Sequence, residues 1–325
     1  MKPVCLGLLL LAFAVLPGSA WSKTLRAADT HPEGYPTVDA VKYMGELLSA
    51  ASGGELSIRV YPGRQLGEER DTLEQTVFGA VDINRLFLPI LNNVVKETNV
   101  FTLPFIFRSI EHFDRVTRGP IGKDILAAME PFGLVGLVFY DSGVRSIYTG
   151  NTPVRKPEDL DGLRIRVPNS DVSVAMIEAL GANATPMEFG QIYEAIRNGA
   201  IAGAENNMPA YSSTGHYEVA PYFSLTEHSM VPEVLVMSKQ SWDKLSTEHQ
   251  RMVREAAEAS VDRMRELWNL REQSALERVV AGGAKIIDDV DKAAFLARVQ
   301  PVYEQYAADP VLADLVRRIQ ETSDE

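Results

Sequence analysis

A repeated alternation of short apolar strands with amphipathic helices constrains the fold of this chain more than any other feature. Residues 25–28 and 56–61 have strand character, and the segment 37–51 between them carries apolar side chains at helical spacing. A second helix over 68–78 and a third strand over 81–83 follow. This β-α-β-α-β order predicts an α/β fold with a parallel sheet and helices on its faces.

The same alternation resumes in the second half of the chain, after a proline-containing interruption. A helix is expected over 119–129, and the continuous apolar content of 134–140 predicts a buried strand. An extended segment over 144–148 then leads through Pro153 and Pro157 toward a new α/β unit. The elements expected in that unit are a strand over 163–167, a helix over 170–180, an extended segment over 184–187, a helix over 189–197 and a strand over 201–204. Two α/β units joined by extended segments predict two lobes.

The C-terminal third is expected to connect these lobes. The apolar strand 234–238 is predicted to return to the first lobe. Ser246 is expected to cap a helix that reaches about residue 280, and a helix of that length would extend about 50 Å, enough to lie across both lobes. We therefore expect a first lobe of 23–147 plus 233–270 and a second lobe of 148–232 plus 271–325.

The N-terminus has the layout of a secretory signal peptide. Lys2 is followed by an apolar run over 6–17 and by the small residues Gly18, Ser19 and Ala20, so residues 1–22 are expected to be removed on export. The run is too short to span a membrane comfortably, and the mature chain is expected to be soluble. Cys5 is the only cysteine and leaves with this segment, so the mature fold must depend on its buried core.

Composition excludes several classes of partner. The chain has 32 basic and 44 acidic residues and a formal net charge of −12, which disfavours binding to nucleic acid or to anionic lipid. An anionic small molecule is still a suitable partner where arginines reverse the local field inside a cleft.

The common catalytic patterns are absent from the sequence. No GxSxG, HExxH, P-loop or GxGxxG pattern occurs, and the five histidines lack metal-ligand spacing. We therefore expect no catalytic residues, no cofactor and no bound metal.

Two arginines are the first candidates for ligand binding. Arg166 falls at the end of the predicted strand 163–167, directly before Pro168, and open α/β sheets bind ligands at such strand ends. Its planar guanidinium can hold a carboxylate through two parallel hydrogen bonds, although a surface salt bridge is the alternative. Arg145 lies at the end of the first half of the chain and is the second candidate.

Other polar and aromatic residues fall at predicted strand ends and turns, and each has a structural alternative. Asn206 could bind hydroxyls or stabilise its own turn, and Phe189 could stack on a sugar or fill the core. His31 could bind a ligand oxygen or cap its loop. The remaining candidates are Asn169, which is expected to cap the next helix or reach the same crevice, and Asn84 and Arg85, which follow the predicted third strand.

Several segments together resemble a known family. GLRIRVP, TPMEF and GAENN occur in this order after YPGRQLGEERDT and LPFIFRS, and together they resemble the solute receptors of TRAP transporters, the DctP-type periplasmic proteins that supply ion-driven membrane permeases. The resemblance extends from about residue 25 to about residue 274. It implies a two-lobed clamshell with hinge strands and a long spanning helix, a periplasmic location, and permease subunits as partners. We expect the receptor to be a monomer.

The resemblance also assigns roles to individual residues. It implies that Arg166 clamps the ligand carboxylate and that Arg145, Asn206 of the GxEN pattern and Phe189 of the TPMxF pattern contribute to the same site. The first-lobe contacts vary within the family, and here the candidates are His31, Glu33, Asn84, Arg85 and either Glu68 or Glu69.

The segments THPEGYPT, NNVVKET and AENN resemble the branch that binds hexuronates, so D-glucuronate or D-galacturonate is the expected ligand. A C4-dicarboxylate is the alternative, because Arg85 or Arg145 could hold a second carboxylate. A secreted uronate isomerase or lyase, and a receptor that signals to a sensor kinase, are further alternatives.

Overall fold

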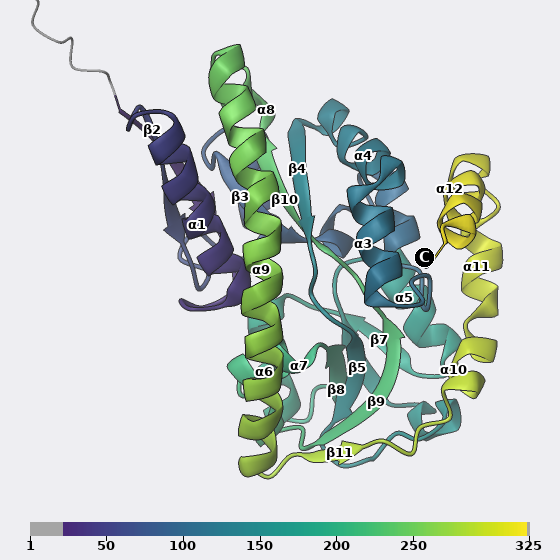
Figure 1. Ribbon diagram of the computed structural model, residues 1–325. Helices are drawn as coiled ribbons and strands as arrows, with labels where there is room; N and C mark the ends of the chain where they lie inside the picture. The colour runs from purple at the N-terminus through teal and green to yellow at the C-terminus, as the bar shows by residue number, and fades with distance from the viewer. Residues whose placement is uncertain (1–21, 324–325) are drawn as a thin grey trace, which may run out of the picture.

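The computed structural model describes residues 22–323, and it consists of two α/β lobes with one long helix running along both (Figure 1). The predicted two-lobed α/β fold is thus confirmed. The predicted signal peptide and Cys5 lie outside the described residues. No helix within 22–323 is long and apolar enough to cross a membrane.

The first lobe is built on a five-stranded sheet in the order β2-β1-β3-β10-β4. The strands β1, β2 and β3 are parallel, whereas β10 runs antiparallel to both of its neighbours, β3 and β4. Their bounds are β1 Lys23–Ala28, β2 Leu56–Tyr61, β3 Ile83–Phe87, β4 Leu134–Tyr140 and β10 Glu233–Ser238. The predicted return of the strand near residue 234 to this lobe is therefore confirmed.

The third strand begins later than the sequence indicated. Asp82 forms the preceding turn, where its side chain accepts a hydrogen bond from the Arg26 backbone at 2.8 Å and its carbonyl accepts one from Ser238 at 2.8 Å. As a result Asn84 and Arg85 lie inside β3 and not after it, which corrects the prediction of a strand over 81–83.

The second lobe is built on a six-stranded sheet in the order β11-β9-β5-β8-β6-β7. The strands β6, β7 and β8 are parallel, and β5 pairs antiparallel with β8 and β9. Their bounds are β5 Arg145–Thr149, β6 Arg164–Val167, β7 Asn183–Pro186, β8 Gly203–Asn206, β9 Tyr222–Ser229 and β11 Lys285–Ile287.

Shorter helices cover the two sheets. They are α1 Pro36–Ala51, α2 Glu69–Val77, α3 Ile110–Arg118, α4 Pro120–Ala127, α5 Asp171–Ala179, α6 Ile192–Arg197, α7 Met208–Ser213, α8 Lys239–Trp242, α10 Lys292–Arg298, α11 Gln300–Tyr306 and α12 Pro310–Glu321. Ser170 caps α5, because its side chain accepts a hydrogen bond from the Ser173 backbone; the expectation that Asn169 caps this helix was wrong.

The long helix α9, Thr247–Ala281, joins the lobes. The Ser246 side chain caps it by accepting a hydrogen bond from the His249 backbone at 3.1 Å, as predicted. Its 35 residues extend over about 52 Å. The helix packs on α1 and β4 of the first lobe and on α7 of the second, so it spans both.

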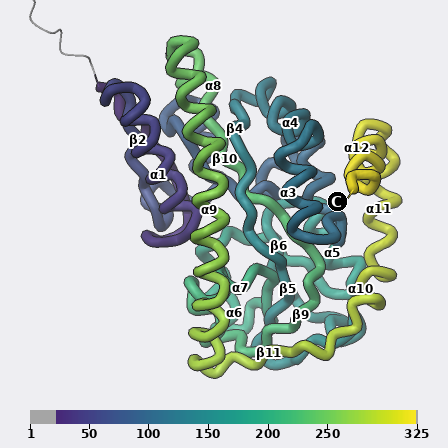
Figure 2. Tube along the Cα trace, in the orientation of Figure 1, coloured from purple at the N-terminus to yellow at the C-terminus, as the bar shows by residue number. Residues whose placement is uncertain are grey.

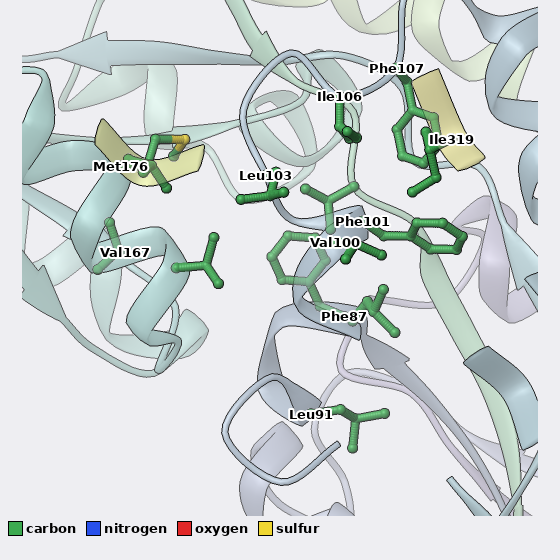
Figure 3. Close-up of a cluster of buried hydrophobic side chains, with 14 of the residues drawn as sticks. Phe87, Leu91, Val100, Phe101, Leu103, Ile106, Phe107, Val167, Met176 and Ile319 are labelled. Atoms are coloured by element: carbon green, nitrogen blue, oxygen red, sulfur yellow. The ribbon is translucent and has the colours of Figure 1, made fainter. Parts of the chain in front are cut away.

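The main chain crosses between the sheets at 141–144, from β4 to β5, and at 230–232, from β9 to β10. A buried apolar cluster fills the space beside these crossings and draws Phe87 and Phe101 from the first lobe together with Val167 and Met176 from the second (Figure 3). The chain then returns through α10 and α11 to α12, which packs beside α4 of the first lobe (Figure 2). The predicted lobe boundaries stay a prediction.

Candidate ligand-binding site

A small polar cavity lies where strand ends of the two sheets meet. The first lobe contributes the loop after β1 together with β3 and the start of β10, and the second lobe contributes β5, β6 and β8. Its polar lining includes the side chains of His31, Glu69, Arg85, Arg145, Arg166, Asn206 and Glu233. Ligands of open α/β folds bind at such a junction of strand ends.

Arg166 is a buried cation with few partners. The two-residue period of β6 places Ile165 and Val167 in the core and leaves Arg164 exposed, while Arg166 is only 4% exposed. Its Nε donates to the Met187 carbonyl at 2.9 Å, and within 22–323 no carboxylate lies within ion-pair distance of it. Burial lowers the pKa of Arg166, which indicates that its charge is poorly compensated.

Arg145, by contrast, is already paired. It donates to both carboxylate oxygens of Glu205 at 2.6 and 2.9 Å, to the Glu205 backbone oxygen at 3.0 Å and to the Asn206 side-chain oxygen at 2.8 Å. Its guanidinium also lies 4.4 Å from the ring centre of Phe87. Although burial opposes the charge, Glu205 raises the pKa of Arg145. Arg145 therefore acts within the protein as a neutralised group that orients Asn206.

Arg85 is paired even more completely. Its guanidinium donates hydrogen bonds to three carboxylates and one hydroxyl: Asp29 at 2.5 and 3.1 Å, Glu69 at 2.6 Å, Glu233 at 2.8 Å and Thr30 at 2.5 Å. These five hydrogen bonds use all the N–H groups of a guanidinium, so Arg85 has no donor left for a ligand.

An aromatic wall connects the two sides of the cavity. His31 stacks on Tyr35 at 3.8 Å between ring centres, and Phe189 of the second lobe meets His31 edge-on at 5.6 Å. The His31 Nε2 lies 3.9 Å from Glu233, and its Nδ1 has no hydrogen-bond partner among the described residues. His31 therefore offers one buried polar atom to a ligand.

Four other predicted residues do not line the cavity. Glu33 is exposed and pairs with Lys42, and the Asn84 side chain donates to Thr76 at 3.0 Å on the opposite face of β3. Since neighbouring strand residues point to opposite faces, Asn84 and Arg85 cannot both face the cavity from inside β3.

The other two lie at the rim, where the lobes approach one another. Glu68 pairs with Arg64 at 3.4 Å and accepts a hydrogen bond from the Gly190 backbone of the second lobe. Asn169 donates to Glu188 at 2.8 Å. Glu68 thus contacts the opposite lobe at the edge of the site.

Two carboxylates that shape the site, Glu205 and Glu233, were not singled out from the sequence, and a third, Glu69, was one of two alternatives with Glu68. Glu69 follows Glu68 directly, Glu205 lies within the GAENN segment, and Glu233 precedes the predicted strand at 234. The sequence patterns include residues next to these carboxylates. Whether Glu68 or Glu69 points into the cavity, however, depends on the residue at which α2 begins. The described residues contain no group of three or more His, Cys, Asp or Glu side chains arranged to hold a metal ion.

Comparison with known proteins identifies the family. The model of the DctP family, bacterial extracellular solute-binding protein family 7, matches residues 27–309. The chain belongs to this family. The predicted resemblance is therefore confirmed, and the family consists of solute-binding receptors.

Individual relatives agree with this assignment. A solute-binding protein of Chromohalobacter salexigens is 39% identical over 304 residues, which cover 93% of this chain and 90% of the relative. A TRAP periplasmic solute binding protein from Bradyrhizobium, solved in complex with α/β-D-galacturonate, is 52% identical with a TM-score of 0.91 and covers 92% of this chain and 100% of its own. A TRAP periplasmic protein from Chromohalobacter salexigens with bound D-glucuronate is 39% identical with a TM-score of 0.89 and covers 91% and 99% of the two chains.

Proposed function

We propose that this protein is the periplasmic solute receptor of a TRAP transporter and that it binds a hexuronate, D-galacturonate or D-glucuronate, through Arg166. In this proposal the chain is exported by its N-terminal signal peptide, acts as a monomer and delivers its ligand to the membrane permease. The solved relatives with bound galacturonate or glucuronate support this choice of ligand.

The proposal depends on the observation that the buried Arg166 guanidinium has no carboxylate partner among the described residues. One of its five N–H groups donates to the Met187 carbonyl, which leaves four for a ligand. A buried guanidinium without a counter-ion is costly, and a ligand carboxylate would supply both the missing charge and a bidentate acceptor. The carboxylate end of the hexuronate therefore belongs at Arg166.

The other two arginines of the cavity argue against a C4-dicarboxylate. A second carboxylate would need a second cation, but Glu205 holds Arg145 and three carboxylates surround Arg85. A hexuronate needs only one cation and presents hydroxyls elsewhere. The Asn206 amide and His31 Nδ1 are suitable partners for those hydroxyls.

The proposed work of the protein is binding and release. The ligand would lie between the lobes, and bending at the two crossings, 141–144 and 230–232, would open and close the site. A uronate isomerase or lyase would instead convert its substrate. Incubation of the protein with D-galacturonate, followed by NMR of the sugar, is expected to show no turnover.

Calorimetric titration tests the proposed ligand and its clamp. The wild-type protein is expected to bind D-galacturonate or D-glucuronate with micromolar or tighter affinity, about −8 kcal/mol, and to bind succinate far more weakly. Arg166→Ala should weaken hexuronate binding by about 2–5 kcal/mol, because it removes one partner of a buried charge pair. Arg164→Ala is the matched control, since Arg164 lies two residues away on the same strand but is exposed. Undiminished binding by Arg166→Ala would refute the clamp.

A further inference from the structure

We infer that Glu69 and Glu233 form an acceptor end of the cavity, which receives ligand hydroxyls and excludes a second carboxylate. This inference rests on the proposed function and adds a specificity to it. The site should select hexuronates over hexarates, the dicarboxylic acids of the same carbon chain. The sequence offered Glu69 only as one of two alternatives, with Glu68, and it did not point to Glu233.

Each of the two glutamates has one oxygen that Arg85 does not hold. Glu69 uses Oε1 to accept hydrogen bonds from Arg85 at 2.6 Å and from the Phe87 backbone at 3.1 Å. Glu233 uses Oε2 to accept from Arg85 at 2.8 Å. Within the described part of the chain, the second oxygen of Glu69 accepts no hydrogen bond, the second oxygen of Glu233 faces His31 Nε2 at 3.9 Å, and both residues line the cavity. These two oxygens are therefore open to hydroxyl donors of a ligand.

Hydrogen bonds from Arg85 fix the two glutamates of the acceptor end in place. Arg85 donates a hydrogen bond to each glutamate and two more to Asp29. Asp29 in turn accepts from the Thr37 hydroxyl at 2.7 Å and the His31 backbone at 2.8 Å. Asp29 is thus fully occupied within the protein, whereas the two glutamates face the cavity in fixed orientations. A preorganised pair of acceptors discriminates between ligand groups better than a mobile pair.

The charge of this end opposes an anion. Three carboxylates surround one guanidinium, so these four side chains carry a formal net charge of −2. Burial raises the pKa of Glu69, and if Glu69 takes up a proton a net charge of −1 remains. A sugar hydroxyl can donate to a carboxylate, but a second ligand carboxylate would meet like charge at low dielectric.

Galactarate, which carries a carboxylate at C1, is the probe for the second charge; since it also lacks the hemiacetal ring of galacturonate, galactonate, an open-chain acid with a single carboxylate, is measured beside it. We expect the wild-type protein to bind D-galacturonate at least a hundredfold more tightly than galactarate in calorimetric titrations. Glu69→Gln and Glu233→Gln should each weaken galacturonate binding about tenfold or more, because each removes a charged acceptor. Each variant should also lower the ratio of the galacturonate affinity to the galactarate affinity at least tenfold.

Glu33→Gln is the matched control, since it removes one negative charge from the same lobe outside the cavity; it should leave both affinities unchanged. Wild-type binding of galactarate within tenfold of galacturonate would overturn the inference, and so would an unchanged preference in both glutamine variants. The wild-type comparison does not depend on whether a variant folds. If the wild type binds no hexuronate at all, the proposed function itself fails.

Discussion

Arg145 and Glu205 form a bidentate ion pair, in which the arginine Nε donates to Oε2 at 2.6 Å and the arginine Nη2 donates to Oε1 at 2.9 Å. Both side chains are about 3% exposed. The pair links β5 to β8 at the wall of the cavity and leaves Arg166 beside it as the cation available to a ligand. In the proposed function, Arg145 therefore stabilises the site while Arg166 binds the ligand.

Breaking this pair should destabilise the protein. We expect Glu205→Ala to lower the free energy of unfolding by about 3–5 kcal/mol, because it leaves the buried Arg145 charge without a partner. Urea unfolding followed by circular dichroism measures the loss. Arg251→Ala, which removes an exposed ion-pairing arginine on α9, should leave stability nearly unchanged. Equal stabilities of the two variants would contradict the assignment of a structural role to Glu205.

Acid should weaken the fold through two buried glutamates. Burial alone would raise their pKa values, but Arg145 lowers the pKa of Glu205 to about 2, and Arg85 lowers that of Glu233 to about 2. Since the unfolded chain protonates these groups near pH 4.5, their stabilising contribution is complete above that pH and is lost as the pH falls toward 2. Urea unfolding between pH 7 and pH 3 measures the loss, which should be smaller in Glu205→Gln.

A buried histidine should add a pH dependence at higher pH. Burial and then the nearby Arg166 charge lower the pKa of His216 from 6.5 to about 3. The folded protein therefore keeps His216 neutral where the unfolded chain protonates it. The resulting stability is complete above pH 6.5 and is lost as the pH falls, by about 1.4 kcal/mol for each pH unit between 6.5 and 3.

The variant His216→Asn isolates this contribution. The free energy of unfolding is measured by urea titration at several pH values between 7 and 4.5. The free energy of unfolding should depend on pH less steeply in the variant than in the wild type. The difference in slope should be about 1.4 kcal/mol per pH unit, which corresponds to one proton. Parallel profiles would show that His216 does not carry the dependence. Because His216 bonds to the Tyr148 hydroxyl at 2.7 Å, the variant is compared by its slope and not by its absolute stability.

Regular hydrophobic patterns allowed most of the fold to be predicted. The strands 56–61 and 134–140 have the predicted bounds, because apolar alternation in the one and a continuous apolar run in the other leave little freedom. β9 was not predicted, since its sequence YFSLTEHS is largely polar and the strand bends at Glu227, where φ is 46°. Pairing with β5 and β11 stabilises it, and local sequence does not reveal such pairing.

The cavity-facing residues of the second lobe could be predicted from the sequence more fully than those of the first lobe. Arg166 could be placed from its own strand, because alternation and Pro168 fix which face it occupies and where β6 ends. In the first lobe the inward-facing acid is Glu69, which depends on the start of α2 at that residue. The full pairing of Arg85 depends on Asp29 and Glu233, which are distant in sequence and meet only in the folded chain.

Closure of the cavity should depend on a contact between Glu68 and Gly190. Glu68 of the first lobe accepts a hydrogen bond from the Gly190 backbone of the second. A Cβ at position 190 would lie 2.3 Å from the Glu68 carboxylate and 3.2 Å from the Arg64 Nε, so a side chain there must displace Glu68. We expect Gly190→Ala to weaken hexuronate binding by up to about tenfold, mainly through faster dissociation, because one interlobe hydrogen bond is worth about 1 kcal/mol.

Stopped-flow displacement measures the dissociation rate, and thermal unfolding of the ligand-free protein serves as the control for folding. Glu68→Ala should produce a similar increase in the rate, because it removes the same hydrogen bond from the other side. The double variant should dissociate no faster than either single variant, since both changes break one contact. Rates that multiply in the double variant would mean that the two residues act independently, and the contact between them would then have no part in closure.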